Sequence, residues 1–332
     1  MSRVWDLIVV GAGPTGIAIG AEARRAGLDA LLIDRGPLTA NLLEFPTFMQ
    51  FFTTRDRLEV AGVPFAVPEA HPSLRQALVY YRAVARQFDL RLALHEEVLA
   101  ATRRDDGFVV RTQAAGGPRE RRARAVVLAT GYFRTPKTLG VPGEELPWVQ
   151  HRYRDPYRHF GERVVVVGGG NSAAEAALEL WRAGVEVTVV HRGEQVRDSV
   201  KYWLRPDFDN RVREGSIRAR YGRRVRAFEE SHGVLLDGAG GAAPEAVPAD
   251  IALVLIGYRP DAELLRGCGV QVDEASLVPS YDPESCETNV PGLYVAGTLQ
   301  SGLDTHRIFI DNSREHAPRI VEHIRRQVSA VV

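Results

Sequence analysis

A short run of apolar, mostly β-branched residues, a glycine-rich turn and a helix-patterned segment follow one another near the start of the chain. The pattern predicts a strand over residues 5–10, a helix over residues 17–26 that ends at Gly27, and a strand over residues 30–33 that ends at Asp34. Elements in this order form a βαβ unit with two parallel strands. The first part of the chain is therefore expected to belong to the α/β class.

The same order of elements recurs in the middle of the chain. It predicts a strand over residues 164–167, a helix over residues 172–183 that ends at Gly184, and a strand over residues 186–190 that ends at His191. The distance from the first turn glycine to the end of the second strand is 23 residues in both copies, from 11 to 34 and from 168 to 191. The chain thus contains an internal structural repeat with different chemistry at the end of each copy.

Both turns carry the glycine spacing of a dinucleotide-binding fingerprint. The spaced small residues are Gly11, Gly13 and Gly16 in VVGAGPTG, and Gly168, Gly170 and Ala173 in VVGGGNSA. The first glycine permits a tight turn, the second lets the backbone approach a pyrophosphate, and the third small residue lets the helix pack on the strand. We therefore expect two nucleotides to be held at once, so that a hydride can pass between them.

The residues at the strand ends predict which nucleotide each turn takes. Asp34 offers a carboxylate to a ribose diol, which indicates FAD or NAD at the first turn. His191 and Arg192 follow the second turn, and the Arg192 guanidinium suits a 2′-phosphate, which favours NADPH over NADH. Arg197 and Lys201 are near enough in sequence to add a second cation. The alternative is an arginine that is only solvated.

Strands and prolines between the repeats predict how the domains are joined. Strands are expected over residues 124–128 and 250–256, and the prolines that follow them mark two linkers. The expected fold is α/β with two Rossmann-like dinucleotide-binding domains, one inserted into the other. The FAD-binding domain would comprise residues 1–137 and 258–332, and the NADPH-binding domain residues 138–257.

Two further segments complete this prediction. Residues 292–297 are expected to return to the sheet of the FAD-binding domain as a last strand. Residues 237–248 are rich in Gly, Ala and Pro, which predicts a hairpin loop on the inserted domain.

Composition narrows the class of protein. The 332 residues carry 42 basic and 42 acidic side chains with no run of like charge, so neither a nucleic acid nor an anionic membrane is an expected partner. The apolar runs are only of strand length, so neither a membrane span nor a signal peptide is expected. Cys268 and Cys286 form no CxxC pair and no metal-ligand spacing. We expect a cytoplasmic protein without a metal site, whose chemistry rests on its cofactors.

Two groups of residues are candidates for the surroundings of a flavin. The aromatic patch consists of Phe45, Pro46, Thr47, Phe48, Phe51 and Phe52. It would cover an isoalloxazine, with Thr47 or Thr53 bonded to the polar edge, although core packing explains the phenylalanines equally well. His306 and His316 flank the last helix, whose positive N-terminal end would face the flavin. Plain surface or core histidines are the alternative.

Together these motifs resemble the two-dinucleotide-binding flavoproteins of the thioredoxin reductase type. The resemblance spans the whole chain and rests on the doubled fingerprint, residues 129–131, His191-Arg192 and residues 293–297. Thioredoxin reductases carry a redox CxxC just ahead of the second glycine motif, where this chain has HRYRDPY at residues 151–157. Their dithiol mechanism is therefore excluded.

The chain is more similar to the bacillithiol disulfide reductase family. The shared segments are Phe45-Pro46-Thr47, Phe51-Phe52, Leu58-Glu59, residues 141–146 and residues 308–312. In that family the fourth residue after the first motif glycine is commonly a cysteine and a proposed redox residue, whereas here it is Thr15. This leaves the flavin as the sole redox centre. Thr298 stands where related enzymes usually have an Asp that holds the ribityl chain.

The motifs and the resemblance together give the candidate cofactor-binding residues. For FAD they are Gly11, Gly13, Pro14, Thr15, Gly16, Asp34, Arg35, Phe45, Pro46, Thr47, Phe52, Val98, Ala129, Thr130, Gly131, Gly297, Thr298 and Ile308. For NADPH they are Gly168, Gly170, Asn171, Ser172, Ala173, His191, Arg192 and Lys201. No side chain is assigned as a catalytic acid or base.

The resulting prediction is an FAD-containing, NADPH-dependent oxidoreductase. Hydride would pass from NADPH to the flavin and then to a disulfide, for which the resemblance implies bacillithiol disulfide. The main alternative is a ferredoxin or flavodoxin NADP reductase, which needs no thiol. A flavin monooxygenase and a non-enzymatic redox sensor are weaker alternatives. Relatives of this type are usually dimers or larger, so a homo-oligomer is expected.

Overall fold

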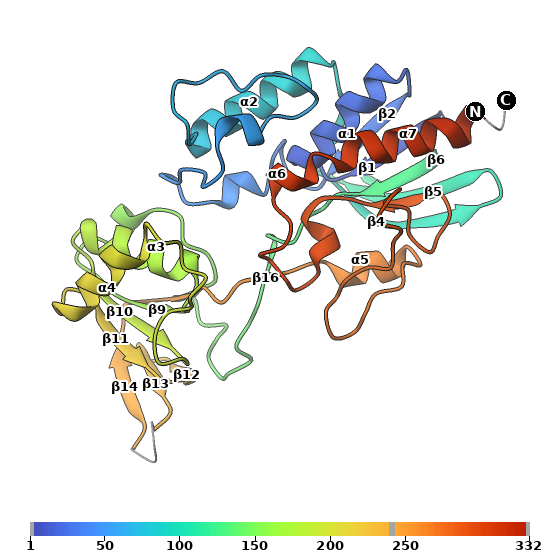
Figure 1. Cartoon of the computed structure of the whole chain (residues 1–332). Coiled ribbons are helices and arrows are strands. Elements are labelled where there is room, and N and C mark those ends of the chain that lie inside the picture. The colour runs from blue at the N-terminus through green and yellow to red at the C-terminus, as the bar shows by residue number, and fades with distance from the viewer. Residues whose placement is uncertain (1–2, 239–242, 330–332) are drawn as a thin grey trace. The chain divides into compact units, whose positions relative to one another are not determined.

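The chain folds into two compact units, seen here in a computed structural model that describes residues 3–238 and 243–329 (Figure 1). The first unit comprises Met1–Thr135 together with Tyr258–Val332, and the second comprises Pro136–Gly257. Each unit is built around its own sheet. The first unit is therefore discontinuous in sequence, and the second is one continuous segment.

The first unit begins with the predicted βαβ arrangement. β1 (Val4–Val10) leads through the glycine turn into α1 (Pro14–Arg25), and β2 (Ala30–Asp34) pairs in parallel with β1. α1 begins at Pro14 rather than at residue 17, because Gly13 is the N-cap and proline suits the first helical position. The φ of proline is already helical, and its missing N–H has no partner to lose there.

Further strands extend this sheet in the order β3-β2-β1-β6-β5-β4, and β17 pairs with β6. These strands are β3 (Arg91–Leu94), β4 (Glu96–Arg104), β5 (Gly107–Ala114), β6 (Gly117–Leu128) and β17 (Leu293–Val295). The parallel pairing of β17 with β6 confirms the predicted return of the C-terminal segment to the first sheet. β6 is longer than predicted because its first half pairs antiparallel with β5.

The sheet of the first unit is buried on both faces. Along β1, Leu7 and Val9 enter one apolar core, whereas Ile8 and Val10 enter the other, as the two-residue period of a strand requires. The first core is covered by the helices α1, α2 (Leu74–Gln87) and α7 (His316–Ser329), and α5 (Ala262–Gly267) lies on the other face (Figure 1). This packing fixes the carboxyl ends of β1, β2 and β6 at one edge, where ligands of such sheets bind.

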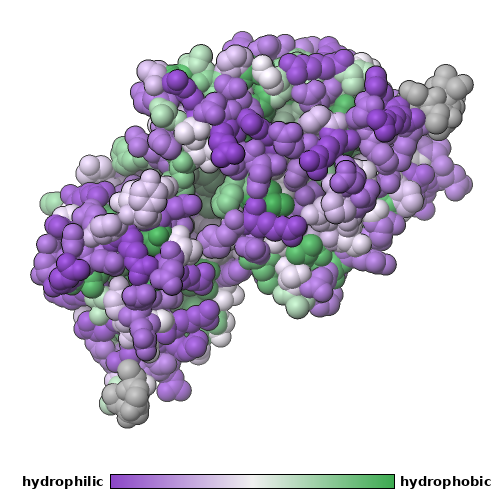
Figure 2. Space-filling view, in the orientation of Figure 1, coloured by the Kyte–Doolittle hydropathy of each residue, from purple (hydrophilic) through white to green (hydrophobic). Residues whose placement is uncertain are grey.

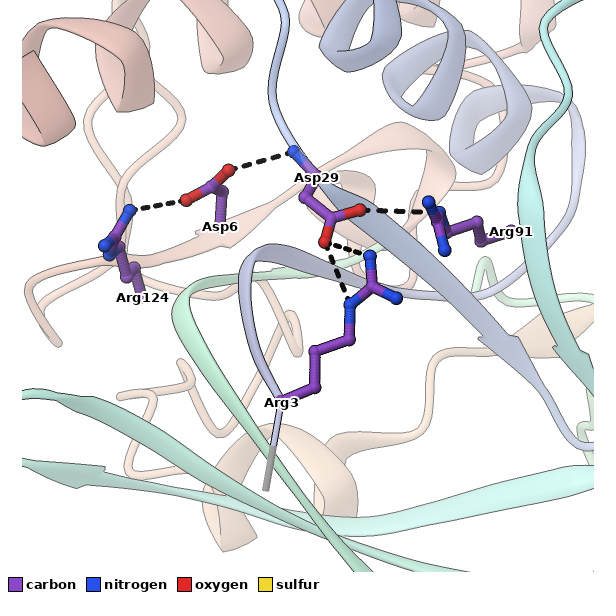
Figure 3. Close-up of polar contacts among 5 residues, drawn as sticks. All are labelled: Arg3, Asp6, Asp29, Arg91 and Arg124. Carbon is purple, nitrogen blue, oxygen red and sulfur yellow. Dashed lines mark hydrogen bonds and ion pairs between the residues drawn. The ribbon is translucent and has the colours of Figure 1, made fainter. Parts of the chain in front are cut away.

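Charged side chains close the opposite edge of the same sheet (Figure 3). Asp29 forms ion pairs with Arg3 and with Arg91, the latter at 3.4 Å. Asp6 accepts hydrogen bonds from Arg124 at 2.6 Å and from the backbone N–H of Asp29 at 2.9 Å. These contacts join residues of β1, β3 and β6 to the residue that precedes β2. Since the side chains are partly exposed, each pair contributes about 0–1 kcal/mol.

The second unit repeats the βαβ arrangement with an all-parallel sheet in the order β11-β10-β9-β15-β8. Its elements are β8 (Val149–Gln150), β9 (Arg163–Val167), α3 (Asn171–Arg182), β10 (Glu186–His191), α4 (Arg205–Arg213), β11 (Arg218–Tyr221) and β15 (Ile251–Val254). α3 packs on β9 and β10 through an apolar face that contains Ala173, Ala177 and Leu180. The predicted α/β class and the predicted repeat are confirmed.

The segment predicted as a hairpin loop over residues 237–248 is in part a strand, so that prediction is wrong for its last residues. β14 (Glu245–Pro248) pairs with β13 (Gly233–Leu236), which pairs with β12 (Val225–Glu229) in an antiparallel sheet. Residues 239–242 lie outside the described residues. The composition of this segment does not predict a strand, because Val247 is the only buried residue of β14. Pro248 is compatible with the strand because it lies at the end of an edge strand, where a missing N–H is tolerated.

Short elements occupy the connections. β7 (Thr135–Pro136) and β16 (Tyr258–Arg259) pair with each other where the chain passes from one unit to the other, and the N–H of Lys137 donates to the carbonyl of Gly257 at 2.9 Å. The remaining short helices are η1 (Leu42–Glu44), η2 (Arg55–Arg57), η3 (Pro156–His159), η5 (Gly297–Ser301) and α6 (Ile310–Ser313).

The molecular face shown in Figure 2 is mostly hydrophilic, and its apolar residues form small separate patches. Within residues 3–238 and 243–329, no helix combines the length and the apolarity that a membrane crossing requires. The most exposed aromatic side chains include Tyr157, Phe160 and Tyr202 of the second unit.

Candidate functional site

The glycine turn between β1 and α1 is shaped by three separate constraints. Gly11 has a φ of +112°, and a β-carbon there would lie 2.5 Å from the carbonyl oxygen of Ala129. A β-carbon on Gly16 would collide with the carbonyl oxygen of Gly11, so α1 packs directly on the turn. A β-carbon on Gly13, in contrast, would meet no described atom within 4 Å. Gly11 and Gly16 are thus required by the fold, whereas the space beside Gly13 is available to a ligand.

The N-terminus of α1 has the properties of an anion site. No side chain in the described part of the chain caps Gly13, and the first turn carries no acidic residue. The first N–H groups of a helix lack intrahelical partners and carry the positive end of its dipole. A pyrophosphate placed beside Gly13 would accept hydrogen bonds from these groups.

A cavity of the first unit opens at this turn. It is lined by Val10, Gly11, Gly13, Ile33, Asp34, Arg35, Asn41, Glu96, Glu97, Val98, Ala129, Thr130, Gly131, Tyr132, Arg134, Thr135, Arg259, Asp261 and Leu264. Eight of the residues predicted for FAD meet here: Gly11, Gly13, Asp34, Arg35, Val98, Ala129, Thr130 and Gly131. The cavity follows the carboxyl ends of β1, β2 and β6.

Asp34 is held rigidly at the cavity wall. Its Oδ2 accepts a hydrogen bond from the N–H of Ala12 at 2.8 Å, and its Oδ1 accepts one from the N–H of Gly36 at 2.8 Å. A carboxylate has about four lone-pair positions, so each oxygen keeps the capacity to accept a further donor. The arrangement suits the hydroxyl groups of a ribose.

Two buried polar atoms of the same cavity have no partner among the described residues. Asn41 donates from Nδ2 to the carbonyl of Thr130 at 3.1 Å, but its Oδ1 accepts no hydrogen bond. The Oγ1 of Thr130 is likewise buried and unpaired. Buried polar atoms are nearly always hydrogen-bonded, so these two indicate a polar ligand. The residues present therefore fit a dinucleotide such as FAD.

Glu96 brings a buried carboxylate to the cavity wall, and two arginines neutralise it. Arg121 donates to it from Nε and Nη2, both at 2.7 Å, Arg119 approaches it at 3.3 Å, and Thr112 donates at 2.6 Å. The hydrogen bonds from Arg121 lower the pKa of Glu96 despite its burial. This network fixes the start of β4 and therefore the position of Val98, a predicted FAD contact.

Thr15 belongs to a second cluster, at the start of α1. Its Oγ1 lies 3.2 Å from the Oγ of Ser313 in α6, and a β-carbon on Gly297 would lie 2.8 Å from the same Oγ1. The N–H of Gly297 donates to Nδ1 of His316 at 3.1 Å. A β-carbon on Gly131 would lie 3.2 Å from the Oγ1 of Thr298. The cluster thus adjoins the cavity through Gly131.

The aromatic patch is divided between core and surface. Phe51 is buried in the first core, which matches the core-packing alternative for that residue. Phe45 packs edge-on against Phe133 at a centroid distance of 4.4 Å, while Phe52 and Pro46 are half-buried. Thr47 is exposed and does not line the cavity. Of the other predicted residues, Pro14 is the first residue of α1 and Ile308 is buried near α6.

The glycine turn of the second unit has the same construction. Gly168 has a φ of +157°, and a β-carbon there would lie 2.5 Å from the carbonyl oxygen of Leu255 and 2.9 Å from the β-carbon of Ala173. A β-carbon on Gly170 would meet no described atom within 4 Å. Gly170 is also an N-cap without a side-chain partner in the described chain. A second ligand space therefore lies at the start of α3, beside the exposed Ser172.

A loop over residues 196–201 is fastened to this turn. The N–H of Arg197 donates to the carbonyl of Gly169 at 2.8 Å, and the N–H of Lys201 donates to Oδ1 of Asn171 at 2.9 Å. Asn171 also donates to the carbonyl of Ser199 at 3.3 Å. Asn171 thus holds a loop that carries Arg197 and Lys201, and the charge of Arg197 acts on His191 at the end of β10.

His191 and Arg192 take different roles at the end of β10. A β-carbon on Gly169 would collide with the imidazole of His191, so the ring lies over the turn. Burial, together with Arg197 and Arg192, lowers the pKa of His191, so the neutral form of the ring predominates at pH 7. Arg192 is exposed. The positive charge beside His191 comes from Arg192 and Arg197 rather than from the histidine.

Several functional candidates were missed by sequence reasoning. They are Asn41, Glu96, Glu97, Tyr132, Arg134, Arg259, Asp261 and Leu264. They reach the cavity from loops, from the start of β4 and from the segment that contains β16 and α5, and none belongs to a fixed-spacing motif. In the second turn, the sequence did give a sign that Gly169 matters. Gly169 is a glycine at a position where the fingerprint accepts any residue, between Gly168 and Gly170.

The described residues offer neither an exposed cysteine nor a cluster of side chains suited to a metal ion. Cys268 and Cys286 are both free and buried, and burial raises the pKa of each thiol. Within the described ranges, no group of three or more His, Cys, Asp or Glu side chains is arranged to hold a metal ion.

Comparison with known proteins agrees with this geometry. Residues 8–297 match the family model for pyridine nucleotide-disulphide oxidoreductases. Bacilliredoxin reductase Bdr of Bacillus subtilis is 34% identical over 318 residues, which are 96% of either chain. The structure of bacillithiol disulfide reductase Bdr (YpdA) from Bacillus cereus superposes with a TM-score of 0.94 at 33% identity and covers 98% of this chain and 100% of its own.

A ferredoxin–NADP reductase of Ignicoccus hospitalis is 26% identical over 302 residues, 89% of this chain and 90% of its own. A thioredoxin reductase structure from T. acidophilum, with a TM-score of 0.77 and 20% identity, shares the fold. The predicted resemblance is confirmed. This chain belongs to the pyridine nucleotide-disulphide oxidoreductases, a family of flavin- and pyridine-nucleotide-dependent oxidoreductases, and within them to the bacillithiol disulfide reductase family.

Proposed function

We propose that the protein is an FAD-containing, NADPH-dependent reductase, with FAD in the first unit and NADPH in the second. The observation that carries this proposal is the pair of glycine turns, alike in construction and different at the end of the following strand. The first ends in Asp34, whose carboxylate suits ribose hydroxyls, and the second ends in His191-Arg192, whose cation suits a 2′-phosphate.

In the first unit, Gly13 and the start of α1 would bind the pyrophosphate, and Asp34 would accept from the adenosine ribose. Asn41 and Thr130 would pair their open oxygens with polar groups of the same ligand. FAD, when bound, supplies the two-electron carrier. In the second unit, the start of α3 would bind the NADPH pyrophosphate, and Arg192, with Lys201 nearby, would bind the 2′-phosphate.

The electron acceptor that we propose is a low-molecular-weight disulfide, with bacillithiol disulfide as the specific candidate. The support is the relationship to a bacillithiol disulfide reductase, over nearly the whole length of both chains. The overall reaction takes one NADPH, one disulfide and one proton, and it yields NADP⁺ and two thiols. In our proposal the protein supplies no thiol to this reaction, because Thr15 carries a hydroxyl group instead of a thiol and both cysteines are buried.

The test is anaerobic oxidation of NADPH by the purified yellow protein with bacillithiol disulfide as the only acceptor. We expect two thiols to appear for each NADPH consumed. Reduced flavin that persists after one turnover, without thiol release, would overturn the disulfide assignment.

Transfer of single electrons to a ferredoxin is the second candidate function, and the absence of an accessible thiol favours it. One curated relative is a ferredoxin–NADP reductase. Cytochrome c reduction that requires both NADPH and added ferredoxin would support this function. It would also separate it from disulfide reduction, which needs no protein carrier.

We further propose that the enzyme works in the cytoplasm as a homo-oligomer. Two free, buried cysteines suit a reducing compartment. Light scattering on the purified holoprotein measures its mass directly, and a monomer of 36.6 kDa would contradict the oligomer.

A further inference from the structure

A half-buried histidine joins the last strand of the first unit to the last helix. β17 leads into η5 at Gly297, and the N–H of Gly297 donates to Nδ1 of His316 at 3.1 Å. His316 is the first residue of α7. Because Nδ1 accepts this hydrogen bond, the single proton of the neutral ring lies on Nε2. The imidazole is thus a fixed acceptor for one backbone group.

The turn that His316 holds lies directly against both parts of the first nucleotide site. Gly297 has a φ of +71°, and its bare α-carbon faces the side chain of Thr15 in the first turn of α1. Thr298 faces Gly131, where a β-carbon would lie 3.2 Å from the Oγ1 of Thr298 and 3.2 Å from Nδ2 of Asn41. A displacement of residues 297–298 would therefore reach both the fingerprint helix and the cavity wall.

The chemistry of His316 suits this role. Burial lowers the pKa of its imidazole to about 4, and Arg319 contributes in the same direction. The ring is neutral over the physiological range, so Nδ1 keeps the lone pair that Gly297 requires. His306, which the sequence pairs with His316, is exposed in the loop before α6 and makes no comparable contact in the described structure.

We propose that His316 is a positioning residue of the flavin site. By accepting the hydrogen bond of Gly297, it fixes residues 297–298 against Thr15 and Gly131, and it thereby sets the affinity of the first unit for FAD. The inference rests on the proposed function, because it takes FAD as the ligand of that unit. His316 acts through Gly297 and is not assigned to the reacting atoms.

The experiment compares four forms of the full chain: wild type, His316→Ala, His316→Asn and His306→Ala. Flavin-free protein is titrated with FAD while flavin fluorescence is followed, and the thermal unfolding midpoint of each flavin-free form is measured in parallel. Asparagine places its amide oxygen near the position of Nδ1, so it can accept from Gly297, whereas alanine cannot.

We expect His316→Ala to weaken FAD binding about 10-fold, as the loss of one buried hydrogen bond implies. His316→Asn should restore the dissociation constant to within about 3-fold of wild type, because the acceptor returns. His306→Ala should bind FAD like the wild type. If His316→Ala does not fold, His316→Gln replaces it, because glutamine puts its amide near Nε2 and leaves Gly297 without its acceptor.

Two outcomes would overturn the assignment. His316→Ala could bind FAD as tightly as wild type, or His316→Asn could bind FAD as weakly as His316→Ala. In the first case, a fall of the unfolding midpoint of His316→Ala would show a role in stability alone. Failure of the proposed function looks different, because the wild-type protein itself would then bind no FAD.

Discussion

Gly13 and Gly16 stand in one turn, but they meet different demands. Gly16 is required by the protein itself, since any side chain there would strike the carbonyl oxygen of Gly11. Gly13 faces open space in the protein and has a φ of −81°, which any residue adopts. A glycine that the fold does not need is best explained by a ligand that approaches the backbone.

Alanine substitution separates these two demands. Gly13→Ala should change the free energy of unfolding by less than about 1 kcal/mol but abolish FAD binding, because the methyl group fills the ligand space. Gly16→Ala should destabilise the fold by about 3 kcal/mol or more, because helix and turn must move apart. Urea unfolding and FAD titration of both variants check this. A Gly13→Ala protein that still retains FAD would remove the pyrophosphate from this position.

The preference of the second glycine turn for NADPH over NADH is tested by removing the charge of Arg192. Arg192→Ala should weaken NADPH binding by about 10- to 100-fold, the value of lost charge-assisted hydrogen bonds, and leave NADH within about 2-fold. Steady-state KM values for both nucleotides provide the measurement. Arg226→Ala is the matched control, because Arg226 is an exposed arginine on β12 of the same unit. Equal weakening of NADPH and NADH would exclude Arg192 from the 2′-phosphate site.

Residues in fixed-spacing motifs were predictable from sequence, and residues that tertiary folding brings together were not. Gly11, Asp34 and the 129–131 segment were predicted, because a strand followed by a glycine turn dictates their place. Asn41 and Glu96 were missed, because a loop and an antiparallel strand carry them to the cavity. Both residues are recognisable only in the folded structure. Asn41 has a buried acceptor without a partner among the described residues, and Glu96 has a buried carboxylate bonded to two arginines.

At the scale of elements, α3 carries a charge arrangement that the fingerprint does not explain. Glu175 and Glu179 are one turn apart on this helix, and Glu179 accepts a hydrogen bond from the hydroxyl of Tyr153 at 2.6 Å. Burial raises the pKa of Glu175 to about 7, and the neighbouring Glu179 adds to the shift. Glu175 is therefore partly protonated at neutral pH in the folded protein.

This shift makes the stability of the second unit depend on pH. The folded pKa of Glu175 is about 7 and its ordinary value is 4.5, so the unfolded state gives up the proton first and stability falls as pH rises between these values. Glu175→Gln cannot ionise, and its stability advantage over wild type should grow by about 2 kcal/mol between pH 5 and pH 8.

Urea unfolding of both proteins at the two pH values gives the comparison. Glu194→Gln, at an exposed position of the same unit, should show no such growth. An advantage of Glu175→Gln that is the same at pH 5 and pH 8 would mean that Glu175 titrates normally in the folded protein.

The elements themselves were predictable where local pattern and global fold agree. Both βαβ arrangements, the return of β17 and the helix ends at Gly27 and Gly184 follow from apolar runs and glycines. Helix starts were less accurate, since α1 begins within the fingerprint at Pro14. β14 was missed because a partner strand, rather than its own composition, makes it a strand. Pairing with another strand leaves little trace in a segment rich in Gly, Ala and Pro.

At the scale of the whole molecule, the two cysteines bear on the number of electrons that the protein can store. Cys286 belongs to the core on one face of the first sheet and Cys268 to the core on the other, so the sheet separates them. The sequence contains no third cysteine. A disulfide between the two would require the sheet to open.

We therefore expect the holoprotein to accept two electrons per FAD. Anaerobic titration should consume one NADPH per FAD without a thiolate–flavin charge-transfer band, because a dithiol would add two more electrons. A Cys268→Ala/Cys286→Ala protein should keep the same end point and retain turnover within about 3-fold, since neither thiol is exposed. Consumption of two NADPH per FAD by wild type, reduced to one in the double variant, would reveal a thiol centre.

The chain enters and leaves the second unit at the same place, because the backbone of Lys137 is hydrogen-bonded to that of Gly257. A segment whose two ends lie close together can be moved as one piece of coding sequence. It can be inserted into a loop of another α/β protein, or removed from one, without changing the distance between the two host residues that flank it. Copying one nucleotide-binding gene into a surface loop of itself is thus a short evolutionary route to an architecture with two unlike cofactors.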